Sequence, residues 1–445
     1  MVSVSLHTAL SGIRAARVGM DTAAHNVANA NTPGFTRQRV DLSTSYPYLS
    51  PNGPMGTGVT VDDITRMRDS FLDARLRSDM GQNGKLDVRA DLLARAEAVL
   101  GEPENGLTGE LTELWASFEE LALRPEDTAT RRQVLSALES LTARVRSVAG
   151  GLEILEKDTI NSLDLAVKEV NALFEQAADL NGRILEARGT GGAPNDLLDA
   201  RDRVLDDLSR RIGATVTLED SGSVRISVSG LAVVSGTRAT PLAFDVDTNE
   251  IRHPAGVAVT PGGEVAGLQT SLTEDLPGLR DGLDAFVDDL VTQLNATHAS
   301  GYVSENVNGG PLLGVTAGAE ALTLQVLITD PGQLAAAEGP SAAPHDGDNA
   351  TKLADLRTGT LDGRLRSFVT EHAANVEATG RAARAQQQLT AAAGTARDGM
   401  HGVSLDEEMV QMLSYQRALE ASSRMMTAVD QALDVLINRM GLVGR

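Results

Sequence analysis

The chain has 445 residues and no cysteine, and its 61 acidic side chains against 39 basic ones give a formal net charge of −22. Without cysteine, disulfides, iron–sulfur clusters, thiolate zinc sites and cysteine nucleophiles are excluded. The acidic balance argues against a nucleic-acid partner, because phosphate backbones are held mainly by lysine and arginine. No apolar run reaches the ~18–20 residues that span a bilayer, and the N-terminus lacks the residue order of a cleavable signal peptide. We therefore expect a soluble protein of several domains with no membrane partner.

The first thirty residues carry a seven-residue repeat. Large aliphatic residues occupy one heptad position and alanines follow three residues later: Leu6, Ile13, Met20 and Val27, then Ala9, Ala16, Ala23 and Ala30. This spacing is typical of a helix that packs closely along a second helix. The pattern stops at Pro33 and Gly34, which disfavour a continuing helix. The sequence predicts an N-terminal helix whose assembly seam consists of these eight residues.

A linker with short β segments is expected over residues 36–65, and a helical pattern follows over residues 66–210. Turn-forming residues interrupt the pattern near Gly101, at Pro125 and again between residues 189 and 194. Asn195 is placed to cap the helix that comes next. These breaks predict a helical-bundle domain, to which residues 355–403 return.

From about Gly213 the hydrophobic period falls to two. Residues 214–218 and 224–228 alternate between apolar and polar side chains on either side of a short turn, which indicates a hairpin with one buried face. Similar alternation over residues 322–328 predicts another strand, and a helical pattern around residues 279–297 separates the two. We expect a β-rich domain over residues 211–354.

The C-terminal segment repeats the heptad pattern behind a helix cap. Ser404 and Glu407 have the spacing of a capping box, which satisfies free backbone amides at the start of a helix. The apolar positions of the helix that follows form a second assembly seam: Leu405, Met412, Tyr415, Leu419, Met426, Val429, Leu433, Leu436 and Met440. Such a stripe is also typical of an ordinary bundle core. A pair of terminal helices would, however, leave further apolar residues exposed for partners: Leu10, Val18, Met409, Leu413 and Met425.

The expected fold is therefore multidomain and mainly α with a β-rich insertion. Residues 1–35 and 404–445 would pair as a coiled-coil-like terminal domain. Residues 66–210 with 355–403 would form a helical-bundle middle layer, and residues 211–354 an outer β domain.

Catalytic patterns are not found in the sequence. It contains no P-loop, dinucleotide fingerprint, nucleophile elbow or H-E-x-x-H motif, and its seven histidines are scattered. Residues 345–349 offer oxygen ligands but lack the full calcium-loop pattern. Three aspartates on one helix face are interleaved with arginines, which favours a solvated, salt-bridged face over a metal site: Asp199, Asp202 and Asp206 with Arg201 and Arg203. We expect no enzymatic activity, no cofactor and no metal.

Motifs at both ends resemble those of flagellar axial proteins. Residues 21–35 are similar to the signature shared by rod, hook and junction proteins, in which we single out Asn26, Asn29, Asn31, Thr32, Pro33, Gly34 and Phe35. The continuation over residues 36–40 resembles the junction protein more closely than the hook protein. Residues 402–409, followed by residues 415–418, resemble the C-terminal motif of the junction protein, and the internal stretches 195–203 and 347–355 also fit. The sequence thus resembles the FlgK family, the first hook-associated proteins, although its central region is short for that family.

The resemblance implies a structural adaptor at the hook–filament junction of the bacterial flagellum, polymerising through its terminal helices. It also implies export through the flagellar type III channel, without a cleavable signal peptide, to an extracellular location. The implied partners are other copies of the chain in a helical tube, the hook protein below, a second junction protein of the FlgL family above, and an export chaperone at the C-terminal helix. A hook or rod axial subunit is the alternative in the same class, and a secreted coiled-coil adhesin or enzyme is the alternative in another.

Overall fold

The computed structural model describes residues 2–50, 53–101, 106–340, 343 and 345–435. The chain divides into two compact units. Unit 1 comprises Met1–Met80, Val170–Pro241 and Gln388–Arg445, and unit 2 comprises Gly81–Glu169 and Leu242–Gln387. The division falls within three long helices: α2 (Ser70–Leu100), α4 (Thr128–Gly189) and α10 (Thr360–His401).

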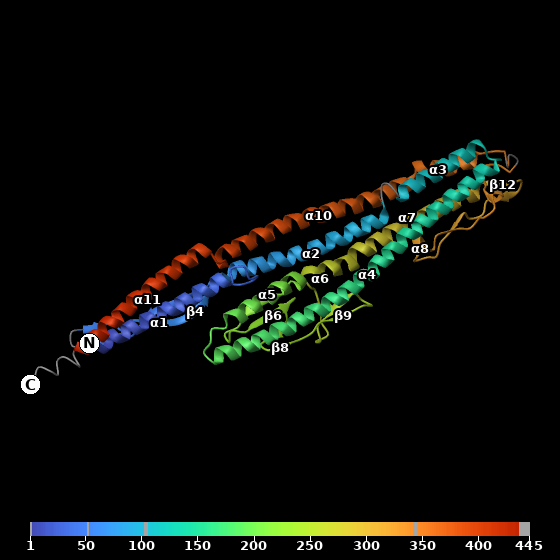
Figure 1. Cartoon of the computed structure of the whole chain (residues 1–445). Coiled ribbons are helices and arrows are strands. Elements are labelled where there is room, and N and C mark those ends of the chain that lie inside the picture. The colour runs from blue at the N-terminus through green and yellow to red at the C-terminus, as the bar shows by residue number, and fades with distance from the viewer. Residues whose placement is uncertain (1, 51–52, 102–105, 341–342, 344, 436–445) are drawn as a thin grey trace, which may run out of the picture. The chain divides into compact units, whose positions relative to one another are not determined.

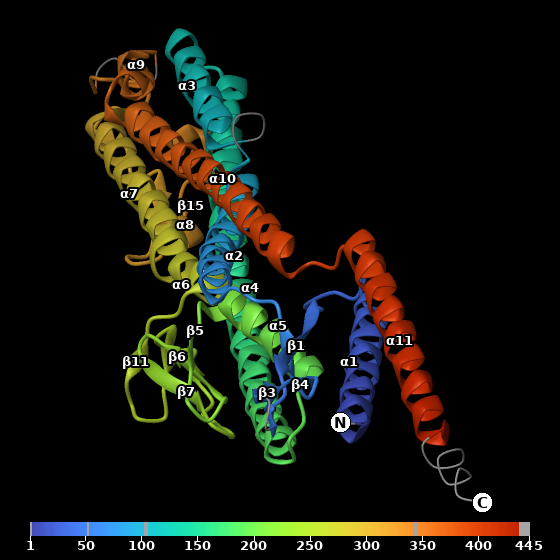
Figure 2. The same cartoon turned by 90° about the vertical axis from the view of Figure 1, so that its left-hand side faces the viewer.

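In unit 1 the two terminal helices, α1 (Val2–Ala28) and α11 (Leu405–Asp434), lie side by side (Figures 1 and 2). The small seam residues of α1 are buried: Ala9, Ala16 and Ala23. The large ones are half-buried or exposed: Ile13 and Met20, then Leu6 and Val27. Because α1 ends at Ala28, Ala30 lies in the turn that follows. Close packing along α1 therefore depends on its alanines more than on its aliphatic side chains.

The seam of α11 is half-buried along its length, at Met412, Tyr415, Leu419, Met426, Val429 and Leu433, whereas Leu405 is exposed. Leu436 and Met440 lie outside the described residues. The described positions between these seam residues are exposed, apart from the buried Glu408 and the half-buried Ser422. One partner helix covers only one stripe of α11, so most of its circumference faces away from α1.

A β-ribbon follows α1 in unit 1. Strand β1 (Gln38–Thr44) pairs antiparallel with β4 (Val59–Arg66), and the short strands β2 (Tyr48–Ser50) and β3 (Gly53–Met55) pair as a hairpin between them. The register shifts between Asp41 and Leu42. The hairpin is thus held at the far end of a two-stranded ribbon.

The rest of unit 1 includes α5 (Asn195–Ile212) and a four-stranded antiparallel sheet of β5 (Thr215–Leu218), β6 (Val224–Val228), β7 (Leu231–Ser235) and β8 (Arg238–Ala239), in that order. Val216 opposite Ile226 confirms the predicted hairpin. Gly213 ends α5 with a φ of 64°, a left-handed conformation that favours glycine.

Unit 2 is mainly helical. Parts of α2, α4 and α10 are joined there by α3 (Leu107–Leu123), α6 (Gly263–Thr270), the π-helical turn η1 (Ser271–Asp275), α7 (Leu276–Ser300), α8 (Glu320–Thr323), α9 (Asp348–Asp355) and the 3-10 turns η2 (Pro331–Gln333) and η3 (Leu356–Thr358). Its core buries Trp115, Phe118 and Phe286. The indole nitrogen of Trp115 donates to Asp362 at 3.0 Å. Helix α7 confirms the predicted helical segment around residues 279–297.

The strands of unit 2 are short and form three small sheets: β9 (Ala243–Asp245), β10 (Glu250–Arg252) and β11 (Ala258–Val259); β12 (Tyr302–Ser304) and β13 (Val307–Asn308); and β14 (Leu313–Gly314) and β15 (Gln325–Val326). The strand predicted over residues 322–328 is wrong for most of its length. Helix α8 occupies its start, because the carboxylate of Asp284 accepts from the amide of Ala321 at 2.8 Å and holds that first turn.

The described helices include none that is both long and apolar enough to cross a lipid bilayer.

Candidate functional site

The N-terminal and C-terminal motifs meet in unit 1 around Glu408. Its carboxylate accepts from Arg37 Nε at 2.6 Å and from Asn26 Nδ2 at 3.0 Å. Arg37 Nη1 also donates to Glu407 at 2.6 Å. The Glu408 side chain is 4% exposed, whereas that of Glu407 is 63% exposed. A buried, hydrogen-bonded ion pair therefore joins the turn after α1 to the first turn of α11.

Electrostatics favour the charged form of Arg37. Burial on its own would lower the pKa of Arg37, but its hydrogen bonds and its charge interactions with Glu407 and Glu408 outweigh that effect and raise the pKa above its ordinary value. The guanidinium thus remains positively charged and holds both carboxylates.

Asn26 links α1 to β1 as well as to α11. Its side-chain amide donates to the carbonyl of Gln38 at 2.8 Å and accepts from the Gln38 amide at 3.0 Å, as a paired strand residue would. The other signature residues shape the turn that separates the two elements. Asn29 donates to the His25 carbonyl at 3.1 Å, and Thr32 donates to Asn29 at 3.1 Å. The signature is thus a helix end and a turn that present Asn26 and Arg37 to α11.

The rest of the signature packs around this turn. The ring of Phe35 lies edge-on to His25, with the centroids 5.4 Å apart. Gly34 has a φ of 75°, and a side chain there would meet Arg203. Asn31 and Pro33 are exposed.

The internal motif over residues 195–203 joins the same site. The amide of Asn195 donates to the Ile64 carbonyl at 2.7 Å and to Gln38 Oε1 at 3.2 Å. The backbone amide of Thr36 donates to Asp199 at 3.0 Å. The prediction that Asn195 caps α5 is wrong: Pro194 occupies the cap position and the Asn195 side chain is directed to the β-ribbon. Local spacing indicated a cap, but tertiary partners decided the contact.

Beside this junction lies a group of ion pairs, the Arg–Asp cluster: Arg66, Arg68, Arg77 and Arg397 with Asp73, Asp199, Asp202 and Asp206. Arg66 Nη1 lies 2.7 Å from both Asp199 and Asp202. Asp206 is bound by Arg77 at 2.8 Å and by Arg397 at 2.7 Å. The cluster thus ties α5 to α2 and to the end of α10.

The predicted salt bridges of the three α5 aspartates are confirmed. The prediction that they lie on a solvated face and pair with Arg201 and Arg203 of the same helix is wrong. The aspartates are buried or half-buried, and their arginines come from other elements. The interleaved Arg201 is buried and donates to Asn181 at 3.1 Å and to the Gly222 carbonyl at 3.0 Å. Burial, together with nearby arginines, lowers the pKa of Arg201 to about 10. Among the described residues no group of acidic or histidine side chains is arranged to hold a metal ion.

A row of α1 that the sequence analysis missed forms the contact line with α11. A Cβ added to Gly12 would lie 2.7 Å from Ser422 Oγ, and one added to Gly19 would lie 2.5 Å from the Tyr415 ring. Asn26 continues the row seven residues later and contacts Glu408. Residue numbers rise along α1 from Gly12 to Asn26, while those of their contacts on α11 fall from Ser422 to Glu408. The two helices are therefore antiparallel. The signal in the sequence was the glycine pair spaced by one heptad, which allows backbones to approach closely.

Replacing Gly19 with alanine is expected to loosen this helix pair by about 1–3 kcal/mol, because the new methyl group overlaps Tyr415. Gly394 in α10 has open space around it, so Gly394→Ala should instead stabilise its helix by up to ~1 kcal/mol. Hydrogen exchange of peptides from α1, α11 and α10 measures both changes. Stabilisation of α1 by Gly19→Ala would rule out the close contact.

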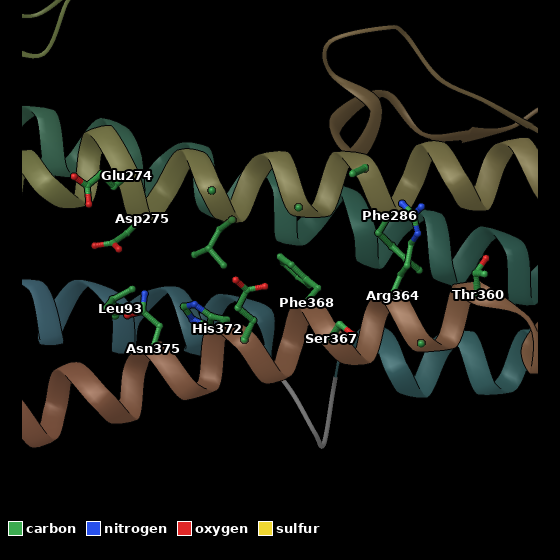
Figure 3. Close-up of a pocket in the computed structure, with 16 residues that line it drawn as sticks. Leu93, Glu274, Asp275, Phe286, Thr360, Arg364, Ser367, Phe368, His372 and Asn375 are labelled. Atoms are coloured by element: carbon green, nitrogen blue, oxygen red, sulfur yellow. The ribbon is translucent and has the colours of Figure 1, made fainter.

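Unit 2 contains a cavity of about 870 Å³ between α7 and α10. Figure 3 shows Arg364 and Phe368 extending from α10 towards α7. A side chain at Gly282 would lie 2.8 Å from the Phe368 ring. Two charged groups of the lining are paired across the helices: Arg89 binds Asp275 through two 2.8 Å hydrogen bonds, and Arg364 binds Asp289. These contacts assign Asp275 and Arg364 to helix packing.

Three buried histidines have pKa values that burial lowers: His298 and His372 in unit 2 and His401 in unit 1. His298 Nε2 accepts from the Ala335 amide at 2.9 Å, while Nδ1 lies 2.6 Å from the Gly310 carbonyl. His401 Nε2 accepts from the Asp69 amide at 3.1 Å. An imidazole nitrogen can accept from an amide only when unprotonated, so the fold requires neutral His298 and His401.

Acidification is therefore expected to lower the free energy of unfolding. The unfolded chain protonates these histidines below their ordinary pKa of about 6.5. In the folded chain their pKa values are lowered, so the same protons bind only at a lower pH. The stability is present above about pH 6.5 and declines as the pH falls towards the folded pKa values. Urea unfolding at pH 7.5 and 5.5 measures this decline. His298→Gln should reduce the difference, whereas His7→Gln at an exposed site should leave it unchanged; equal slopes for both variants would contradict the assignment.

Comparison with known proteins identifies the class of the chain. The family model of flagella basal body rod proteins matches residues 6–36, and that of the flagellar basal body rod FlgEFG protein C-terminal region matches residues 400–440. These matches cover the two motifs that meet at Glu408. The chain is thus a flagellar axial protein.

A third model, the helical domain of the flagellar hook-associated protein FlgK, matches residues 93–313. The flagellar hook-associated protein 1 of Bacillus subtilis is 29% identical over 99% of both chains. The flagellar hook-associated protein 1 of Salmonella typhimurium is 27% identical over 69% of this chain. The match covers only 59% of that relative. The chain belongs to the FlgK family of flagellar hook-associated proteins.

A solved structure shows the same fold. The flagellar hook junction protein FlgK from Burkholderia pseudomallei aligns with a TM-score of 0.50 at 24% identity, over 55% of this chain and 47% of that one. The expected fold class, multidomain and mainly α with a β-rich insertion, is confirmed. The expectation of a structural protein of the flagellar hook region is confirmed by the family model and by relatives named flagellar hook-associated protein 1.

Proposed function

We propose that the chain is the adaptor that joins hook to filament by polymerising through unit 1. The supporting observation is that the two ends of the chain are joined by the buried contacts of Glu408 while apolar residues of α11 remain exposed. Met409, Val410 and Leu413 are each exposed by half or more. Apolar strips of this kind mark partner surfaces.

The proposed assembly domain consists of residues 1–35 and 404–445, and the two seams supply its contacts. A helical tube requires heterologous contacts between successive copies, because isologous pairs close on themselves. The proposed partners are further copies of the chain, the hook protein below, a FlgL-type junction protein above, and an export chaperone that holds the C-terminal helix before assembly. The helical domain (66–210 with 355–403) and the β-rich domain (211–354) would face outwards from this tube.

The proposed route is export through the flagellar type III channel to the extracellular flagellum. A chain without cysteine cannot form disulfides in transit or outside the cell. Terminal helices that order fully only beside their neighbours would couple folding to polymerisation.

Removal of residues 404–445 tests the proposal. In cells that lack their own junction protein, the full chain should label hook tips by immunogold microscopy and restore filaments, whereas the truncated chain should reach the medium without being incorporated. Secreted protein in the medium controls for export. Filaments on cells that make only the truncated chain would refute the proposal. A fixed small oligomer in solution without hook-tip label would favour the secreted adhesin instead.

A further inference from the structure

A groove of about 410 Å³ runs between α1 and β4 in unit 1. Its walls are mainly apolar, with two basic side chains at the rim: Leu10, Val18, Val59 and Val61 with His7 and Arg14. Ser11 Oγ accepts from the Val59 amide at 3.2 Å and holds β4 against this part of α1. The groove is therefore a built feature of the fold with a fixed position along α1.

The β-ribbon continues from this groove into an exposed apolar hairpin. Tyr46 is 96% exposed and Leu49 is 79% exposed, and Tyr48 lies between them. The chain has only four tyrosines, and two of them lie here. Tyrosine is enriched in the cores of protein interfaces, where it contributes apolar area and a polar group together. The groove and hairpin together form one surface, which we call the α1–β4 surface.

A second unpartnered surface lies at the start of α11. The residues Met409, Val410 and Leu413 are exposed. Asp406, just before them, is exposed as well, whereas Glu407 and Glu408 bind Arg37. At the rim of the groove the exposed Arg14 carries a positive charge, and neither Asp62 nor Asp63 of β4 lines the groove. The two surfaces are thus both apolar, and Asp406 of one is opposite in charge to Arg14 of the other.

The start of α11 and the hairpin are too far apart to meet within one copy, although Tyr415 further along α11 reaches Gly19 beside the groove. The start of α11 lies beside Asn26, through Glu408, while the hairpin end of β4 lies beside Ser11. At 1.5 Å per residue the two positions are about 22 Å apart along α1. Two complementary surfaces displaced along one axis produce a heterologous contact that repeats without closing.

We propose that the α1–β4 surface of one copy receives the acidic, apolar start of α11 from a second copy. The inference rests on the proposed function and specifies one of its contacts. Met409, Val410 and Leu413 of the second copy would lie in the groove and under the hairpin, and Asp406 would lie near Arg14.

Because the chain has no cysteine, introduced cysteines report this contact directly. Cells expressing Leu49→Cys/Leu413→Cys are oxidised, and isolated hook–junction particles are run on a non-reducing gel. A disulfide requires Cα atoms within about 7 Å, so a bridge within one copy is excluded by the axial separation. We expect a ladder of linked copies from the double variant, at least tenfold stronger than from Leu165→Cys/Leu413→Cys, in which Leu165 is an exposed residue of α4 in unit 2. Each single variant should remain monomeric on the gel.

Two outcomes would overturn the inference and leave the proposed function standing: hook tips labelled by antibody without a ladder, or a dimer from Leu49→Cys alone, which indicates hairpin-to-hairpin pairing. Absence of the full chain from hook tips would refute the proposed function itself. If the first double variant is not incorporated, Val61→Cys/Met409→Cys probes the same contact through the groove and carries the same expectations.

Discussion

Glu408→Ala is expected to lower the local unfolding free energy of the α1–α11 pair by about 3–5 kcal/mol, because it removes the buried partner of a largely buried cation and leaves only the exposed Glu407. Arg37 would lose its 2.6 Å contact, and Asn26 would lose an acceptor at 3.0 Å. Hydrogen exchange of α1 and α11 peptides measures the change. Swimming of cells that depend on the variant, measured in soft agar, should decrease as well.

Glu407→Ala is a closely matched control. Glu407 is the same residue type, lies one position earlier and contacts the same guanidinium at 2.6 Å, but its side chain is mostly in solvent. Exposed ion pairs contribute little, so the expected loss is below about 1 kcal/mol. Equal losses for the two variants would mean that burial does not decide the strength of this contact.

Asp202→Ala should have a comparably large effect, about 3–5 kcal/mol on the stability of unit 1. Asp202 binds Arg66, Arg68 and Arg77, so its removal leaves three half-buried cations close together. Each of the three keeps one carboxylate, Asp199, Asp73 or Asp206, but Arg397 also binds Asp206, so four arginines would then share three carboxylates.

Asp207→Ala controls for loss of an aspartate from the same helix. Asp207 is half-exposed and lies 3.7 Å from Arg210, three residues further along the helix. Because this ion pair is exposed to solvent, its loss should cost less than about 1 kcal/mol. Urea unfolding followed by hydrogen exchange of α5 peptides compares the variants. A loss for Asp202→Ala no greater than that for Asp207→Ala would show that the Arg–Asp cluster does not stabilise unit 1.

Local features of the chain were predictable because they depend on near neighbours. Ser404 accepts from the amide of Glu407 at 3.4 Å, as the capping box predicts, and α11 begins at Leu405. The half-buried positions of α11 follow the predicted heptad. The break at Pro125 separates α3 from α4, and the predicted hairpin has its expected pairing.

Predictions failed where a side chain had both a local and a distant option. Asn195 was expected to cap its own helix but binds the β-ribbon, and Glu407 completes only half of its capping box because its carboxylate binds Arg37. In each case the tertiary fold brings a hydrogen-bond partner to the side chain, and the position of that partner is not encoded in the neighbouring residues.

By itself, the sequence determined the long helices of this protein, the breaks between them, the cap of α11 and the two terminal motifs, since periodicity and turn chemistry act over a few residues. Only the tertiary structure decided that Asn26 and Arg37 meet Glu408, and that Gly12 and Gly19 rather than the large aliphatic row form the line of closest approach. The physical reason is that contacts across nearly the whole chain depend on how α1 and α11 are registered. That register is set by close backbone approach at Gly12 and Gly19 and by one buried ion pair, and the partners of both contacts lie almost a whole chain away.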